Sequence, residues 1–235
     1  MRGKTADCTS AGASGGRVVI FDCNGVLVDS EPIANGVLAD ALRDAGITLS
    51  ADALASEFHG RRTSDILAAI ETAAKRQFTP DFASKIAADT LERLRADLRA
   101  VPHAAHALSW IRGPKAVASS SSIDRIRLSL EVTDLLRFFE SRLFSANYVT
   151  NGKPAPDLFL LAAERLEVDP ADCVAVEDSA VGVAAASAAG MKPIGFVGRS
   201  RAEGTLARDL ARAGARAVIA DLRALKSAIT DLRGW

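Results

Sequence analysis

A chain of 235 residues can form one large domain, or a domain that carries a smaller insertion. Its 29 basic and 29 acidic residues balance, so it lacks the basic excess typical of nucleic-acid-binding and membrane-surface proteins, and we expect neither partner. Hydrophobic residues make up 49% of the chain but aromatic residues only 5%, which favours helices packed on a buried sheet. No stretch is apolar for long enough to suggest a membrane span.

The cysteines and the first residues bear on the location of the protein. Cys8, Cys23 and Cys173 lie far apart and lack metal-ligand spacing, as isolated reduced thiols do. Such thiols are typical of cytoplasmic proteins, so we predict a cytoplasmic location. Residues 1–16 are rich in Gly, Ala, Ser and Thr and have no apolar run like that of a signal peptide, so we interpret them as a disordered tail.

Short apolar runs alternate with helical patterns along most of the chain. The first run, RVVIF at 17–21, has the β-branched composition of a buried parallel strand. Further strands are predicted at 115–119, 142–146, 173–177, 193–197 and 217–220. Helices are predicted at 103–112, 123–131, 156–167, 179–189, 203–213 and 221–233. This alternation predicts a doubly wound parallel sheet, a Rossmann-like α/β core whose active site lies at the carboxyl ends of the strands.

One interval breaks the alternation. Residues 22–114 separate the first strand from the second, which is too long for a single crossover. Helical patterns fill this interval at 32–45, 51–58, 63–75 and 80–98. We therefore expect an α-helical cap domain over 32–102, inserted into an α/β catalytic core made of 17–31 and 103–235. Because the insertion leaves from the end of the first strand, it should lie over the active site.

Polar side chains follow the first two strands where they end. Asp22 comes directly after the first strand, and Gly25 allows the backbone to turn tightly and approach a ligand. Ser119 and Ser120 follow the second strand just before a helix, where hydroxyl and backbone N–H groups suit an anion. Taken singly, these features are also explained by an Asn-Gly turn and by helix capping.

Charged side chains follow the third and fourth strands. Lys153 is held between Gly and Pro in a stiff loop, where a fixed ammonium can neutralise a carboxylate and a phosphoryl oxygen. Glu177 and Asp178 are adjacent at a buried strand end, and a hard cation such as Mg²⁺ is their natural compensation. A solvated lysine and a helix-capping aspartate are the simpler explanations, but they do not account for all four features at one edge of a sheet.

The four motifs together resemble the haloacid dehalogenase superfamily of aspartate-nucleophile phosphotransferases, over residues 17 to about 220. FDCNGVLVDSE, GKPAPDLF and VEDSAVG are most similar to the subgroup of β-phosphoglucomutase and sugar-phosphate phosphatases, which carries a helical cap. The resemblance implies that Asp22 attacks phosphorus and forms an aspartyl-phosphate. It also implies that Ser119 binds the phosphoryl group and that Lys153 stabilises charge on both.

The resemblance further implies a Mg²⁺ cofactor. Its ligands would be Asp22, the backbone carbonyl of Asn24 and Asp178, with Glu177 orienting the site. The phosphatases of the family have a second aspartate where this chain has Asn24, and that aspartate protonates the leaving oxygen and then activates water. An amide cannot exchange a proton in this way. The chain is then a slow enzyme, a binding protein that has lost catalysis, or a chain altered to trap a ligand.

The segment FHGRRTSD at 58–65 resembles the substrate-specificity loop of the family's cap. Gly60 permits a turn, and Arg61 and Arg62 could clamp a second anionic or polyhydroxyl part of the substrate, unless both are solvated or pair with cap carboxylates. We expect His59 to be structural. The mutases of the family have a histidine at a position that corresponds to Ala34 here, which disfavours a mutase.

These observations favour a Mg²⁺-dependent phosphatase of a small phosphorylated metabolite, with a sugar phosphate as the expected class. The alternatives are a non-catalytic phosphometabolite-binding protein, a phosphoglucomutase-like phosphotransferase and, less favoured, a dehalogenase. A monomer or a weak homo-oligomer is expected.

Overall fold

The computed structural model describes residues 17–198 and 203–232. The tail predicted at 1–16 lies outside the described residues. Within the described part of the chain, the helices fall short of the length and apolar character that a bilayer crossing requires.

A parallel sheet forms the centre of the molecule. Its strands are β1 Val18–Phe21, β2 Lys115–Ser119, β3 Leu143–Ser145, β4 Cys173–Glu177, β5 Lys192–Phe196 and β6 Ala217–Ile219. The order across the sheet is β3-β2-β1-β4-β5-β6, and every neighbouring pair is parallel. The chain runs outward from β1 to β3 and then returns to place β4 on the other side of β1. The strand order therefore reverses between β1 and β4, where doubly wound sheets bind their ligands.

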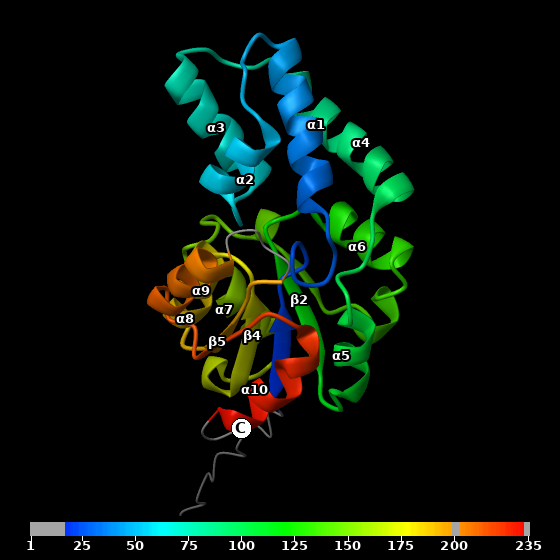
Figure 1. The fold of residues 1–235 in the computed structure, drawn as a ribbon, viewed down its shortest axis with the longest axis vertical. Helices are drawn as coiled ribbons and strands as arrows, with labels where there is room; N and C mark the ends of the chain where they lie inside the picture. The colour runs from blue at the N-terminus through cyan, green and yellow to red at the C-terminus, as the bar shows by residue number, and fades with distance from the viewer. Residues whose placement is uncertain (1–16, 199–202, 233–235) are drawn as a thin grey trace, which may run out of the picture.

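Alternating side chains of the strands form two hydrophobic layers. Val19 and Phe21 face one layer, whereas Val18 and Ile20 face the other. The first layer packs against α5 Ala104–Trp110, α6 Ile123–Val132 and α10 Leu225–Asp231. The second packs against α7 Asp157–Arg165 and α8 Ala180–Ala188, and α9 Glu203–Arg212 extends this side beside β5 and β6 (Figure 1). The short 3-10 helices are η1 Leu136–Phe138, η2 Ala146–Tyr148, η3 Pro170–Asp172 and η4 Leu222–Ala224.

The predicted strands and core helices are present, with shifted boundaries. The third strand is shorter than predicted, and the fifth begins one residue earlier, at Lys192. The single closing helix predicted at 221–233 is wrong, because the described part of this segment contains η4 and then α10. Asp221 accepts a hydrogen bond from the Arg223 N–H, which starts the 3-10 turn, and Leu232 is already extended after α10.

The helical insertion forms a cap with a hydrophobic core of its own. Its helices are α1 Glu31–Asp44, α2 Ala51–Phe58, α3 Thr63–Ala74 and α4 Pro80–Asp97. They stand over the carboxyl ends of the strands, and the last turns of α4 reach down beside α6 (Figure 1). The two connections to the core lie side by side, because the Val101 N–H donates to the Leu27 carbonyl and the Asp29 N–H to the Arg99 carbonyl. The expected α/β fold with an inserted cap is confirmed.

Candidate active site

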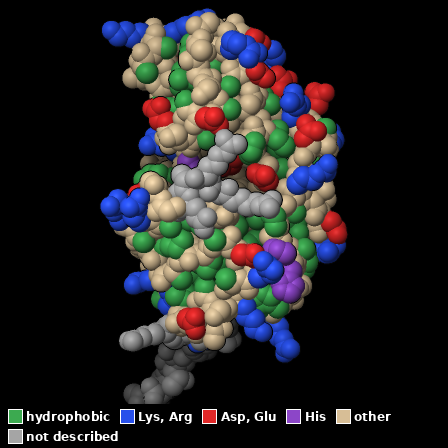
Figure 2. Space-filling view, viewed as in Figure 1, with side chains coloured by type: hydrophobic (Ala, Val, Ile, Leu, Met, Phe, Trp, Pro, Cys, Tyr) green, Lys and Arg blue, Asp and Glu red, His purple; other side chains and the backbone are tan. Residues whose placement is uncertain are grey.

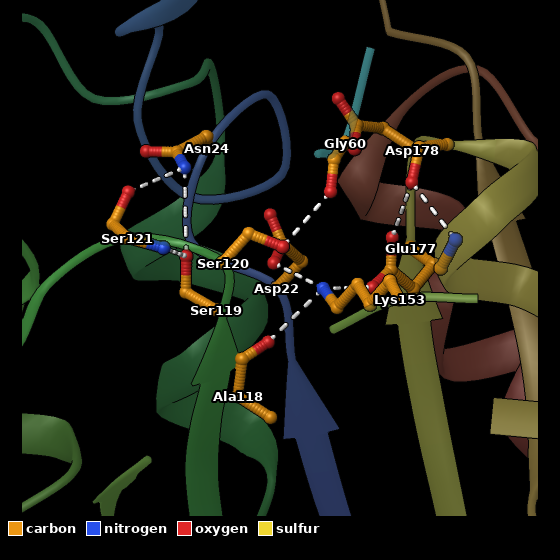
Figure 3. A network of polar contacts seen from close by, with 12 residues as sticks. Asp22, Asn24, Gly60, Ala118, Ser119, Ser120, Ser121, Lys153, Glu177 and Asp178 are labelled. Atoms are coloured by element: carbon orange, nitrogen blue, oxygen red, sulfur yellow. Dashed lines mark hydrogen bonds and ion pairs between the residues drawn. The ribbon is translucent and has the colours of Figure 1, made fainter. Parts of the chain in front are cut away.

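Three charged side chains from three strand-end loops meet below the cap. Asp22 follows β1, Glu177 ends β4, and Lys153 comes from the loop that precedes α7. The Lys153 ammonium donates to Asp22 Oδ1 at 2.7 Å, to the Ala118 carbonyl at 3.3 Å and to Glu177 (Figure 3). All three residues are buried, so these charges are held in a low-dielectric site with fixed geometry.

Burial and charge act in opposite directions on this group. Burial alone lowers the pKa of Lys153, but the charges of Asp22 and Glu177 outweigh it and raise the pKa well above the usual range. Burial raises the pKa of Glu177 to about 7, with Lys153 opposing the shift. The lysine therefore stays charged. It offsets the negative charge of Asp22, and the Asp22 carboxylate still lines the cavity.

The loop after β1 brings Gly25 against the Asp178 carboxylate. Gly25 has a φ of +72°, and a Cβ at this position would collide with Asp178. The structure therefore explains this glycine by the close approach of two strand-end loops. Gly25 was expected to bind substrate; it does not line the cavity, and that role stays a prediction.

Hydrogen bonds hold the Asn24 amide on both sides. Its Nδ2 donates to Ser121 Oγ at 2.9 Å and to Ser119 Oγ at 3.4 Å, whereas its Oδ1 accepts from Ser30 Oγ at 2.8 Å. Figure 3 shows the amide nitrogen directed at Ser119, the last residue of β2, and at Ser121, which follows the strand. Asn24 thus joins the loops after β1 and β2, and its amide does not ionise at ordinary pH, so it cannot act as an acid or a base.

The cap contacts the core through His59 and Gly60. Nε2 of His59 lies 3.1 Å from Asp178 Oδ2 and 3.1 Å from Glu31 Oε1. Burial lowers the pKa of His59, but Asp178 and Glu31 more than offset this and raise the pKa to about 11, so the imidazole is positively charged. Ser120 Oγ donates to the Gly60 carbonyl at 2.8 Å, and a Cβ on Gly60 would collide with the Ser179 side chain.

The two adjacent arginines of the cap loop differ in their surroundings. Nε of Arg62 donates to Asp65 Oδ2 at 2.9 Å, and its Nη1 reaches the carbonyls of Ala146 and Val149 at 3.4 and 3.5 Å. Arg62 therefore braces the cap on the core and does not line the cavity. Arg61 is exposed and does line it, so it is better placed to reach a substrate.

A cavity between cap and core connects these groups. Its core side carries Asp22, Asn24, Ser120, Ser121 and Asp178. Its cap side combines apolar side chains, among them Leu38, Leu54, Phe58, Ile66 and Ile86, with polar ones such as Asn35, Thr63 and Thr90. On the outer surface, by contrast, side chains of both charges are interspersed over the face that Figure 2 shows.

Of the residues predicted from the sequence, Asp22, Asn24, Gly60, Arg61, Ser120 and Asp178 line the cavity. Ser119, Lys153 and Glu177 support it from behind and are joined to it by hydrogen bonds. Glu31 and Arg125 also line the cavity and were not among the predicted site residues. Glu31 belongs to the FDCNGVLVDSE motif and could have been found there, whereas Arg125 lies in an ordinary helical pattern.

The carboxylates of the site fit a hard divalent cation. Asp22 and Asp178 both line the cavity, and burial raises the pKa of Asp178 to about 6 even though His59 acts against this shift. Such crowding of buried oxygen ligands is relieved by a cation like Mg²⁺. Glu177 is less suited to direct ligation, because its oxygens already contact Lys153 and Ser179. Its metal role stays a prediction.

Comparisons with known proteins agree with this geometry. Residues 17–190 match the family of haloacid dehalogenase-like hydrolases. The 6-phosphogluconate phosphatase of Escherichia coli is 29% identical over 183 residues, which is 76% of this chain and 81% of that protein. A haloacid dehalogenase-like protein of unknown function from Agrobacterium tumefaciens is 34% identical, with a TM-score of 0.76 and coverage of 92% and 98%. The β-phosphoglucomutase of Clostridium difficile shares the fold at 18% identity, with a TM-score of 0.77 and coverage of 92% and 98%.

Proposed function

Because the chain belongs to the haloacid dehalogenase-like hydrolase family, we propose that it is a Mg²⁺-dependent phosphatase of a small phosphorylated metabolite. One observation carries the proposal: Asp22 lines the cavity below the cap while Lys153 holds its Oδ1 at 2.7 Å. A sugar phosphate is the favoured class, since a relative acts on 6-phosphogluconate.

The first chemical step uses the free oxygen of Asp22. This oxygen forms a bond to phosphorus, the ester P–O bond breaks, and the phosphoryl group moves to Asp22 while the alcohol part of the substrate leaves as an alkoxide. Lys153 neutralises charge on the carboxylate, and the donors after β2 bind the phosphoryl oxygens. Bound Mg²⁺, held by Asp22, the Asn24 carbonyl and Asp178, would neutralise further phosphate charge.

Asn24 limits the protonation of the leaving group. The alkoxide needs a proton, and hydrolysis of the aspartyl-phosphate needs an activated water, but the amide supplies neither. Substrates with a good leaving group therefore react at the first step, whereas alkyl phosphates react slowly. This residue is also the observation that favours the second candidate function, a phosphometabolite-binding protein. A mutase is disfavoured because Ala34 puts a methyl group on the cavity wall.

A metabolite panel with Mg²⁺ tests the proposal. We expect phosphate release from some phosphomonoesters, and a burst with added mass on Asp22 when p-nitrophenyl phosphate is the donor. Tight binding of a phosphometabolite without release or labelling would instead favour the binding protein. The absence of both binding and labelling would refute both functions.

The metal assignment has its own test. Asp178→Asn removes a charged oxygen ligand, so Mg²⁺ affinity measured by calorimetry should fall at least about tenfold while the fold stays intact. Far-ultraviolet circular dichroism checks the fold. Unchanged Mg²⁺ affinity would rule Asp178 out as a ligand.

Location and assembly stay predictions from the sequence. The thiols of Cys23 and Cys173 are free and buried, which accords with a reducing cytoplasm but does not establish it. A monomer or weak homo-oligomer is expected, and sedimentation of the purified chain would measure the state directly.

A further inference from the structure

Arg125 is a cation on the cavity wall that the phosphatase mechanism does not use. It lies in the first turn of α6, and its side chain points back toward the cavity, beside Asn24 and Ser121. The residue reaches the cavity from the core and not from the cap loop. It therefore lies on the same wall of the cavity as Asn24, the position at which the family's phosphatases carry the aspartate that protonates the leaving oxygen.

The other buried charges of the site already have partners. Asp22 and Glu177 share Lys153, whereas Glu31 and Asp178 share His59. Among the described residues that line the cavity, Arg61 and Arg125 remain as cations without a carboxylate within 4.0 Å. Arg61 is exposed and can be solvated, whereas Arg125 is half-buried and its Nε is fully buried.

The guanidinium of Arg125 is incompletely satisfied. Its Nη2 donates to Ser30 Oγ at 3.4 Å, a long bond to a neutral group. Its Nε is buried and has no hydrogen-bond partner within the described part of the chain. Burial lowers the pKa of Arg125, with partial opposition from Cys23, Glu31 and Asp22. A buried guanidinium N–H without a partner costs free energy, and that cost falls when an anion binds to the guanidinium.

We propose that Arg125 is a specificity-determining residue that binds a second anionic group, a carboxylate or a second phosphate, on the leaving part of the substrate. The planar guanidinium presents parallel N–H donors that match the oxygens of either group. The inference rests on the proposed function, because it presumes that the phosphoryl group binds at Asp22. It adds to that function by requiring a second negative charge on the substrate.

A purely positioning role is the competing explanation. Arg125 donates to Ser30, which in turn donates to Asn24, so the arginine could only hold this hydrogen-bonded chain in place. That role uses Nη2 and leaves the buried Nε without a function. It also predicts no dependence of binding on the charge of the substrate's far end, which separates the two explanations.

The test uses non-hydrolysable phosphonates with chains of two to four carbons that end in a carboxylate, a second phosphonate or a hydroxymethyl group. Their affinities are measured by calorimetry with Mg²⁺ present. The unmodified protein should bind a carboxylate or diphosphonate at least about tenfold more tightly than the matching alcohol. Which anion is preferred distinguishes a carboxylate substrate from a bisphosphate. Equal affinities at every chain length would overturn the inference.

Variants locate the preference. Arg125→Gln should abolish the preference for an anionic end group. Arg125→Lys should retain part of this preference, since the positive charge stays but the parallel N–H donors of the guanidinium are lost. Arg127→Gln makes the same charge change at an exposed position of α6 and should leave the preference unchanged. A preference that survives Arg125→Gln would refute the assignment. If inorganic phosphate and all the phosphonates fail to bind, the proposed function falls and the inference with it. If phosphate binds and the end group has no effect, only the inference falls.

Discussion

The two sides of the cavity are built differently. On the core side, Asp22, Lys153 and Glu177 are buried and bonded to one another, and Asn24 is fixed by three hydroxyls. On the cap side, the wall mixes apolar side chains such as Leu54 and Phe58 with polar ones such as Asn35 and Thr63, and Arg61 is exposed.

This difference separates the chemistry from the choice of substrate. The core groups are preorganised by a rigid sheet, so they can act on any phosphoryl group that reaches Asp22. The cap supplies shape and closes the cavity through a few contacts of His59 and Gly60 with the core. Changes to Asp22 or Lys153 should therefore alter the rate for all substrates, whereas changes to Arg61 on the cap side, or to Arg125 on the core side, should depend on the substrate.

Removing the nucleophile should have the largest effect. Asp22→Asn keeps the size of the side chain but cannot form the aspartyl-phosphate, so turnover of p-nitrophenyl phosphate should fall about 10⁴-fold or more. Asp29→Asn, at an exposed position of the same loop, serves as the control. If Asp22→Asn retained the phosphorylated intermediate in a mass spectrum, another residue would be the nucleophile.

Restoring an acid at position 24 should have the next largest effect. Asn24→Asp supplies a group that can protonate the leaving oxygen, so turnover of alkyl phosphates should rise about 10²–10⁴-fold, with a smaller gain in the first step for p-nitrophenyl phosphate. Asn35→Asp adds the same charge elsewhere on the cavity wall and should give no such gain. Unchanged alkyl-phosphate turnover in Asn24→Asp would mean that another group supplies the proton.

The packing of the cap on the core can be disturbed by a substitution at a single glycine. Gly60 has a φ of +79° and touches the Ser179 side chain, so Gly60→Ala should destabilise the protein by about 1–3 kcal/mol and lower its melting temperature. Gly36→Ala is the matched control, because nothing lies within 4 Å of its added Cβ and it is helical. The control should be neutral or slightly stabilising. Equal melting temperatures for both variants would argue against close packing of Gly60 on Ser179.

The two cap arginines should have the smallest effects, and only the effect of Arg61 should depend on the substrate. Arg61→Ala should change preference among metabolites by a few fold and leave small aryl phosphates unaffected, because Arg61 lines the cavity without holding the fold. Arg62→Ala should cost about 0.5–1 kcal/mol of stability through its contact with Asp65 and affect all substrates alike. Steady-state kinetics on a metabolite and an aryl phosphate measure both. The opposite pattern would reverse the two roles.

The α/β core, the inserted cap and the charged residues of the core side follow from patterns in the amino-acid sequence. Strand and helix periodicities are local signals, and the carboxyl ends of parallel strands must meet at one edge of the sheet. Asp22, Lys153 and Asp178 could therefore be placed together before any contact was known.

By contrast, the contacts between cap and core, and the pairing of each cation, depend on tertiary packing. His59 is joined to Asp178 across 119 residues and Ser120 to Gly60 across 60, and no local pattern encodes such pairs. In the sequence, Arg125 does not differ from any other arginine of an amphipathic helix, so the pattern does not mark it as a site residue. The burial of its Nε and the lack of a carboxylate within 4.0 Å depend on how α6 packs beneath the cap, because a charge is paired or unpaired only through the neighbours that folding brings to it.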